Sequence, residues 1–140
     1  GTLPAGQLAE LCFSGKYTHG EIKKLLTGQG GLVALMGTNN AKEVADKAEA
    51  GDKEAALIEQ AMGYGVGKSI GACAAVLHGK VDAILLTGGM AYGKALTDGI
   101  EAMVSFIAPV KVYPGEDELG ALAMNGLMVL RGDIKAKIYE

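Results

Sequence analysis

Apolar residues near the middle of the chain form a short, nearly unbroken run that is followed by a helical pattern. Residues 81–86 read VDAILL and predict a parallel strand that is buried on both of its faces. Thr87, Gly88 and Gly89 end the run, and the apolar residues beyond Tyr92 recur at helical spacing. A strand, a glycine turn and a helix make up the arrangement on which α/β proteins hold nucleotides. The pattern fits a tight turn without a ligand equally well.

The segments on either side of this stretch are predicted mainly as helices. Two further strands are indicated, one over residues 32–36 and one over residues 110–113. The second should pair in parallel with residues 81–86, because strands connected by a helix usually pair through a right-handed crossover. Thr18 and Glu21 have the spacing of a capping box. Helices are predicted over residues 8–15, 18–28, 40–51, 53–77, 90–108 and 116–131.

The longest predicted helix carries an unusual row of small residues. Gly63, Gly67 and Gly71 follow one another at four-residue spacing, and Ala75 continues the row. Each glycine costs about 1 kcal/mol relative to alanine inside a helix. Such a row indicates that another element packs very close to this face. A neighbouring strand or helix is the expected partner, ahead of a ligand.

Composition limits the classes of protein to which the chain could belong. Its 140 residues suit one domain, and 49% hydrophobic with 21% charged residues describe a soluble globular chain. A net charge of −3, the lack of a basic stripe and 5% aromatic residues argue against a nucleic-acid partner. Glu59 and Lys68 interrupt the longest helical segment, which argues against a membrane span.

Cysteines and histidines are too few and too scattered to predict a metal cluster. Cys12, Cys73, His19 and His78 make up the whole inventory, and they have no credible ligand spacing. Two unclustered cysteines suit a reducing cytoplasm, which is the expected location. The first four residues do not resemble a signal peptide. Because the chain does not start with Met, we expect it to begin inside a longer protein.

Three short motifs each allow a binding role and a plainer one. Residues 88–94 have the P-loop spacing G-x-x-x-x-G-K, but Ala95 stands where a P-loop has its Mg²⁺-binding hydroxyl, which makes a P-loop the weaker interpretation. Residues 37–40 read GTNN, which favours an ordinary helix N-cap over a phosphate-binding turn. Residues 116–118 read EDE, which favours stabilisation of a helix dipole over a carboxylate cluster for Mg²⁺.

Four stretches together carry a resemblance to a known family. They read GTLPAGQLAELCFSGKYT, GGLVALMGTNNAKEV, VDAILLTGGMAYGK and VYPGEDELGALAMNGL. In this order they resemble the C-terminal part of the butyrate kinases, in the acetate and propionate kinase branch of the sugar-kinase, actin and heat-shock ATPase superfamily. The resemblance implies an α/β fold, one lobe of the actin-like ATPase (ribonuclease-H-like) fold with a short, mainly parallel sheet. It also implies a single domain with a helical lead-in over residues 1–31, an α/β core over 32–131 and a tail over 132–140.

The resemblance further implies which residues meet ATP or ADP. Gly88 and Gly89 would approach the ribose and the α-phosphate as part of the family's adenosine motif. The full set of nucleotide-binding residues that it implies is Thr87, Gly88, Gly89, Met90, Ala91, Tyr92, Gly37, Thr38 and Asn39. Glu118, with Glu116 second, would be the catalytic carboxylates on the side of Mg²⁺. No protein cluster that holds a metal by itself is expected.

Two positions depart from the family's GTND-x-R-E segment. Asn40 stands where the family has Asp, and Lys42 stands where it has Arg. An asparagine cannot accept a proton, and a lysine cannot grip a phosphate as a bidentate fork. The departures therefore weaken any catalytic role carried over to these two residues.

The reaction that the resemblance implies is transfer of the γ-phosphoryl group of ATP to butyrate or a related short-chain fatty acid, which gives an acyl phosphate and ADP. The family's D-x-G-x-T hairpin is missing, so we expect this lobe alone to lack turnover. The expected partners are adenine nucleotide, the fatty acid in the complete enzyme and further copies of the chain, with neither nucleic acid nor membrane. The alternatives are a non-catalytic nucleotide-binding or self-associating module and, less favoured, a P-loop NTPase.

Overall fold

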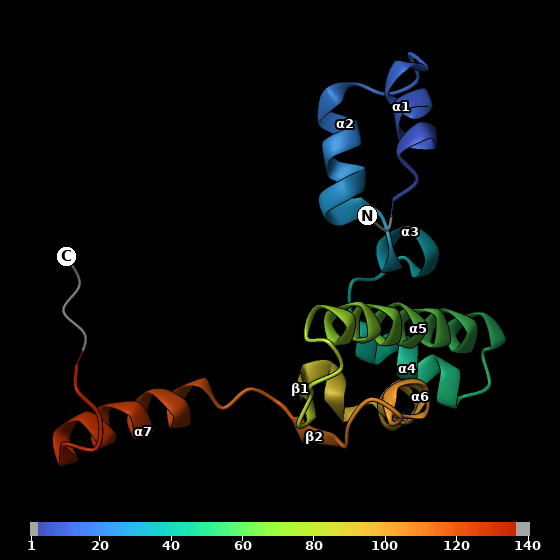
Figure 1. Cartoon of the computed structure of the whole chain (residues 1–140). Helices are drawn as coiled ribbons and strands as arrows, with labels where there is room; N and C mark the ends of the chain where they lie inside the picture. Colours follow the sequence, from blue (N-terminus) through green and yellow to red (C-terminus); the bar gives the residue numbers. More distant parts are fainter. Residues whose placement is uncertain (1–2, 137–140) are drawn as a thin grey trace. The chain divides into compact units, whose positions relative to one another are not determined.

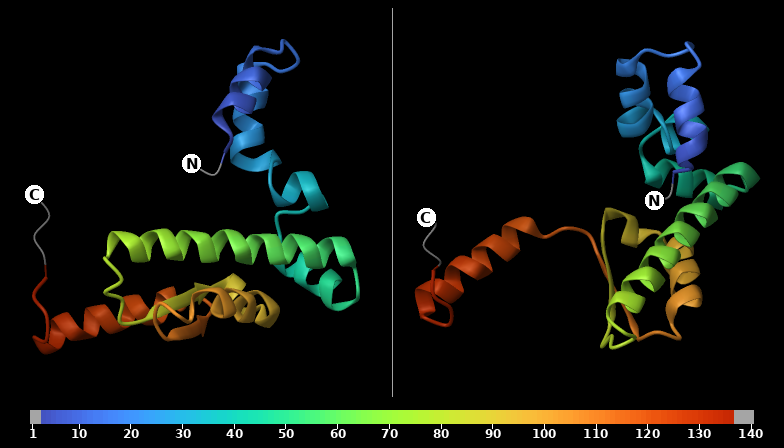
Figure 2. Two further views of the ribbon diagram at one scale, coloured as in Figure 1. Left: turned by 45° about the vertical axis from the view of Figure 1, so that its right-hand side comes forward. Right: turned by 45° about the horizontal axis from the view of Figure 1, so that its top comes forward.

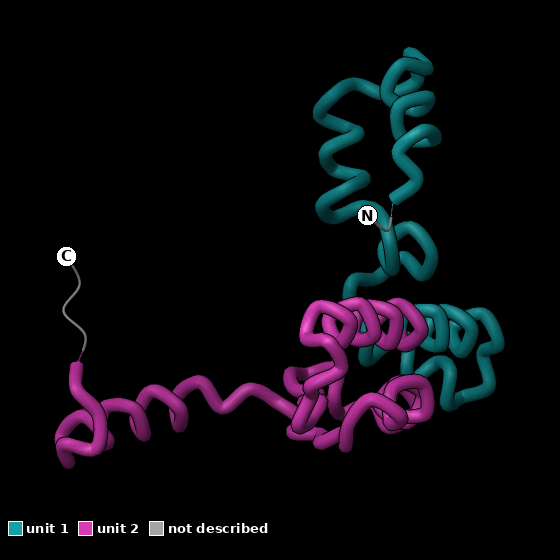
Figure 3. Tube along the Cα trace, viewed as in Figure 1, with its two compact units in different colours: residues 1–62 teal, residues 63–140 magenta. Residues whose placement is uncertain are grey.

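The computed structural model describes residues 3–136, and helices make up most of this range (Figure 1). The chain divides into two compact units, residues 1–62 and residues 63–140 (Figure 3), and each unit is described by itself. The elements, in chain order, are α1 (Ala5–Phe13), α2 (His19–Lys24), the π-helix η1 (Leu25–Gln29), α3 (Leu32–Met36), α4 (Ala41–Glu49), α5 (Lys53–Val76), β1 (Ile84–Gly88), the 3₁₀-helix η2 (Gly89–Tyr92), α6 (Lys94–Val104), β2 (Val110–Pro114) and α7 (Glu118–Arg131).

Polar residues that the sequence predicted as caps begin α2, α4 and α5. The Thr18 hydroxyl accepts a hydrogen bond from the Glu21 backbone N–H at 3.3 Å, and the Glu21 carboxylate accepts one from the Thr18 N–H at 2.7 Å, which completes the capping box of α2. Asp52 accepts hydrogen bonds from the backbone N–H groups of Glu54 and Ala55 at the start of α5. The capping box and the Asp52 cap are therefore confirmed.

The small core of unit 1 lies among α3, α4 and the first turns of α5. Val44, Ala55 and Ile58 are its buried members. Partly buried apolar side chains pack around them, namely Leu32, Met36, Ala48 and Met62.

The expected strand over residues 32–36 is wrong, because these residues form the helix α3. Gly31 at φ +57° precedes the helix, and Gly37 ends it in the left-handed conformation at φ +70°. Leu32 and Met36, four residues apart, both reach the core, whereas Leu35 is exposed. Within residues 3–136 the strands are β1 and β2, so a strand here would have had no partner for its backbone groups.

The predicted parallel strand pair is confirmed in unit 2. β1 and β2 pair in parallel, with Ile84 opposite Val110 and Gly88 opposite Pro114. The expectation that the first strand is buried on both faces is wrong. Ile84 is buried, but Leu85 on the other face is 59% exposed. In the part of the chain that the structure describes, the sheet has these two strands only, with too little structure around them to cover both faces.

The glycine row of α5 has the close partner that was expected for two of its three members. A Cβ added at Gly63 would lie 3.3 Å from Leu96, and one added at Gly67 would lie 2.8 Å from the end of Met103, both on α6. Figure 2 shows α6 running beside this half of α5. A Cβ at Gly71 would meet no atom within 4 Å. The close packing predicted there is therefore wrong, since α6 ends before it reaches Gly71.

The last two helices of unit 2 differ in what they bury. The helix expected over residues 90–108 is two elements, η2 and α6, separated at Gly93, and α6 buries Leu96, Ile100 and Val104. α7 is confirmed, with a left-handed Gly132 at its end, but its apolar face is open and Leu119 is 83% exposed. Residues 137–140 of the predicted tail lie outside the described residues. Within the described range, no helix combines the length and the apolar character that a membrane span requires.

Candidate functional site

The end of β1 is held by a pair of glycines from different parts of the chain. The Gly88 N–H donates to the Gly115 carbonyl at 3.3 Å, and the Gly115 N–H donates to the Gly88 carbonyl at 3.0 Å. Gly88 has φ +85° and ψ 178°, and Gly115 has φ +91°. Residues with a Cβ rarely adopt such conformations. The turn after β1 therefore requires glycine at both positions.

The residues that follow Gly88, from Gly89 to Ala91, leave one side of this turn open. Gly89 has no positive φ, and a Cβ added there would meet no atom within 4 Å. The Ala91 side chain is buried and anchors η2, while Met90 is partly exposed. The structure thus brings Thr87 through Tyr92 together as one continuous turn, with the backbone at Gly89 free to approach a ligand.

Tyr92 lies against the far glycine of the pair. A Cβ added at Gly115 would fall 2.5 Å from the Tyr92 hydroxyl oxygen and 3.3 Å from the ring carbon that carries it. Tyr92 as a whole is nevertheless 72% exposed. Its hydroxyl end is therefore packed at the turn, while most of its ring faces solvent. Sequence reasoning missed a role for Gly115 at the site, although the Pro114–Gly115 pair at the end of β2 indicated a turn there.

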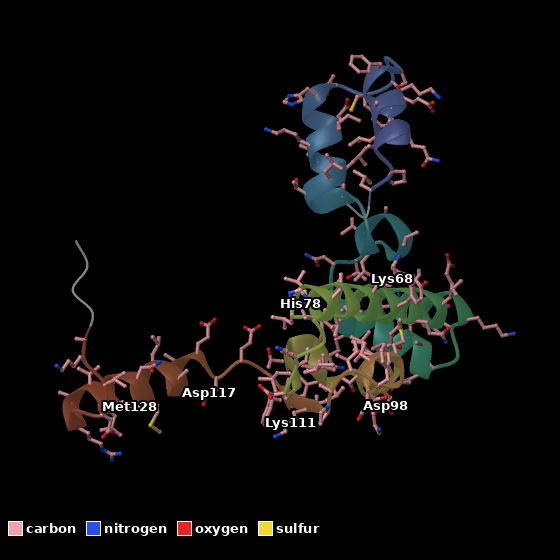
Figure 4. All side chains as sticks on the ribbon, in the orientation of Figure 1. Lys68, His78, Asp98, Lys111, Asp117 and Met128 are labelled. Atoms are coloured by element: carbon pink, nitrogen blue, oxygen red, sulfur yellow. The ribbon has the colours of Figure 1, made fainter. Side chains whose placement is uncertain are left out.

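The acidic residues that follow β2 do not converge on one point. The Glu116 carboxylate lies 3.6 Å from where a Cβ on Gly88 would sit, so it stands beside the glycine turn. Asp117, labelled in Figure 4, accepts a hydrogen bond from the Gly120 N–H at 2.9 Å and caps α7. Glu118 is the first residue of α7 and is exposed. Among residues 3–136, no three or more His, Cys, Asp or Glu side chains group as a metal site.

The geometry at Lys94 does not favour the P-loop interpretation. The Lys94 ammonium binds the Asp98 carboxylate at 2.6 Å, one turn further along α6. This hydrogen bond, with the charge of Asp98, raises the pKa of Lys94 above its ordinary value of 10.5. A P-loop lysine reaches back over the loop to the phosphates. Here the residues before Lys94 form the 3₁₀-helix η2 instead of an open loop.

The second predicted nucleotide segment, Gly37, Thr38 and Asn39, lies in unit 1. The Thr38 hydroxyl and the side chain of the following Asn40 bind backbone groups within the turn. The Thr38 hydroxyl accepts from the Asn40 N–H at 3.1 Å, and the Asn40 side chain accepts from the Lys42 N–H at 3.0 Å. The favoured N-cap interpretation of Asn40 is therefore confirmed.

Lys42, which departs from the family pattern, is also engaged within its own helix. Its ammonium group binds the Asp46 carboxylate at 2.8 Å, and both side chains are exposed. The hydrogen bond and the charge of Asp46 raise the pKa of Lys42 above 10.5. The residue forms a surface pair along α4.

Known proteins provide an independent view of the chain. The model of the acetokinase family matches residues 8–104. Butyrate kinase 2 of Clostridium acetobutylicum is 58% identical over 140 residues, which is 100% of this chain and 39% of that protein. The predicted resemblance to the butyrate kinases is confirmed. Because the match covers 39% of the relative, the chain spans well under half the length of that protein.

Two solved structures share the fold. An acetate kinase from Porphyromonas gingivalis matches with a TM-score of 0.73 at 21% identity, over 93% of this chain and 39% of that chain. A propionate kinase from Francisella tularensis subsp. tularensis SCHU S4 matches with a TM-score of 0.69 at 22% identity, over 85% and 36%. The predicted fold class, one lobe of the actin-like ATPase fold, is confirmed. By its sequence and its fold, the chain belongs to the acetokinase family.

Proposed function

We propose that this chain is the nucleotide-side lobe of a carboxylate kinase that transfers the γ-phosphoryl group of ATP to butyrate or a related short-chain fatty acid. The observation that carries the proposal is the 58% identity to a butyrate kinase along the entire chain. The reaction gives an acyl phosphate and ADP. Phosphoryl transfer depends on positioning and on neutralisation of charge, so each lobe contributes part of the machinery.

The glycine turn after β1 is the proposed adenosine site. Gly88 and Gly89 receive the ribose and the α-phosphate, while Thr87, Met90, Ala91 and Tyr92 line the pocket. The open space at Gly89 supports this role, because a ligand can reach the backbone there without displacing a side chain. Gly37, Thr38 and Asn39 are proposed as a second contact with the nucleotide, through backbone groups.

A Mg²⁺ ion that arrives with the nucleotide needs few ligands from the protein. This ion usually keeps several waters and binds through substrate phosphates and only one or two carboxylates. Glu118 and Glu116 are the proposed carboxylates, and the position of Glu116 beside Gly88 supports its part in this pair. The ion would neutralise charge on the phosphates, while these side chains orient its water shell.

Separated from the rest of the kinase, the lobe should bind nucleotide weakly and form no acyl phosphate. Lys94, which follows the turn, is already paired with Asp98. Charge-assisted contacts to the β- and γ-phosphates, each worth roughly 1.5–3 kcal/mol, are therefore few. We expect a dissociation constant for ADP of about 1 mM or weaker.

Titration of the chain with ADP, comparing the wild type with Gly89→Val, tests the site. Because Gly89 has an ordinary φ and open space around it, the valine should fold normally and obstruct only the ligand. Gly99→Val on α6 is the matched control, since Gly99 is equally open but lies on a helix away from the turn. Equal ADP binding by Gly89→Val and the wild type would remove the adenosine assignment. Acyl phosphate formation by the isolated chain would overturn the one-lobe proposal instead.

A further inference from the structure

The connection between β2 and α7 meets the glycine turn at a residue that no nucleotide-binding motif includes. β1 and β2 run parallel, yet Gly88 and Gly115 form an antiparallel bridge, because each N–H donates to the carbonyl of the other residue. The two hydrogen bonds of this bridge join the backbone of the turn to the backbone of the connection. The residues on either side of Gly115 are therefore held in place relative to Gly89.

Gly115 also controls where the side chain of Tyr92 can lie. The Tyr92 hydroxyl occupies space that any Cβ at position 115 would enter, since the separation would be only 2.5 Å. Real Cβ atoms essentially never approach another heavy atom below 3.0 Å. With any other residue at position 115, the ring would have to move away from the turn.

We propose that Gly115 is a positioning residue for the nucleotide site, which keeps the Tyr92 ring beside the glycine turn as a stacking surface for the adenine base. This inference rests on the proposed function. The hydroxyl end of Tyr92 lies against Gly115, while 72% of the residue is exposed. An aromatic ring in this position offers its face to a base at a low cost in side-chain entropy. Glu116, the next residue after Gly115, is placed beside Gly88 by the same bridge.

The variant Gly115→Ala tests this inference with Gly132→Ala as its control. Both glycines have positive φ, +91° and +79°, so an alanine strains the backbone at either position. A Cβ at Gly132 meets no atom within 4 Å, whereas a Cβ at Gly115 strikes Tyr92. Gly132→Ala therefore controls for an alanine at positive φ, and the rescue by Tyr92→Phe described below tests the contact with the tyrosine.

Ligand-observed NMR with ADP measures the affinities, and thermal unfolding measures the stability of each variant. We expect Gly115→Ala to weaken ADP binding about tenfold. Gly132→Ala should bind like the wild type. The double variant Gly115→Ala, Tyr92→Phe removes the oxygen that clashes and should regain at least half of the lost affinity on a logarithmic scale. A purely structural role for Gly115 would not produce this rescue.

Four outcomes would overturn the inference. Binding by Gly115→Ala that equals that of Gly132→Ala would remove it and leave the adenosine site standing. The absence of any rescue by Tyr92→Phe would also remove it. If Gly115→Ala does not fold, the variant Tyr92→Ala tests the stacking role instead, because it adds no backbone strain. An ADP affinity of Tyr92→Ala equal to that of the wild type would exclude the stacking role. A wild type that does not bind ADP would overturn the proposed function itself, and this inference with it.

Discussion

Three helices of unit 1 begin at polar residues whose side chains bind the backbone, whereas the close contacts of unit 2 depend on glycines. Thr18, Asn40 and Asp52 each accept hydrogen bonds from N–H groups two or three residues along the chain. In unit 2, Gly67 and Gly115 leave room for side chains that are distant in the sequence. The polar caps complete a local structure, and the glycines permit a tertiary one. A capped turn has fewer free groups for a ligand than a glycine turn has.

The largest change in stability that this comparison predicts is for substitutions of the α5 glycines. Gly67→Leu should lower the free energy of unfolding by more than about 2 kcal/mol, because the new side chain overpacks against Met103 on α6. Gly71→Leu should instead raise it by up to about 1 kcal/mol, since leucine is a better helix former and that site is open. Chemical denaturation of the two variants measures both changes. Equal shifts in the same direction would contradict the packing of α5 against α6.

An intermediate loss of stability is expected when alanine replaces a glycine of positive φ, and its size should differ between Gly88 in unit 2 and Gly37 in unit 1. Gly88→Ala should destabilise by about 2 kcal/mol, because φ +85° with ψ 178° is essentially restricted to glycine. Gly37→Ala should cost about 1 kcal/mol, because Gly37 lies in the left-handed helical region and has open space around it. Thermal unfolding of both variants gives the comparison. A larger loss for Gly37→Ala would reverse the distinction between the turns.

The smallest effect is expected at the capping box of α2 and depends on pH. Hydrogen bonds from the Thr18 backbone and hydroxyl lower the pKa of Glu21 below its ordinary value of 4.5. The carboxylate therefore contributes stability that is present above pH 4.5 and is lost as the pH falls through the lowered value. Glu21→Gln should reduce this dependence. A pH series of unfolding midpoints for the wild type and Glu21→Gln tests it, and parallel curves below pH 4.5 would show that the box contributes nothing.

Local patterns were enough to predict most of the helices and the parallel strand pair. The caps at Thr18, Asn40 and Asp52 depend on hydrogen bonds that span three residues at most, so their partners are visible in the sequence. Residues 32–36 could not be predicted in this way, because five apolar residues fit a buried strand and a short helix equally well. Their conformation follows from the glycines at each end and from the core beneath Leu32 and Met36.

Part of the candidate site could likewise be predicted from local sequence, and part could not. Thr87 through Tyr92 are consecutive, so their grouping followed from the strand and the two glycines that end it. Gly115 was missed, because its pairing with Gly88 depends on the register of β1 with β2 and on the isolated bridge beyond the end of the strands.

The sequence by itself determined the family of this chain, the caps of its helices and the glycine turn after β1. The caps and the glycine turn depend on residues that are neighbours along the chain. The family follows from several motifs that occur in a fixed order along the sequence. Only the tertiary structure decided that Gly63 and Gly67 have a close partner while Gly71 has none, and that Tyr92 lies over Gly115. The sequence shows where a glycine lacks a side chain. Which atoms fill that space depends on packing between segments that are far apart in the chain.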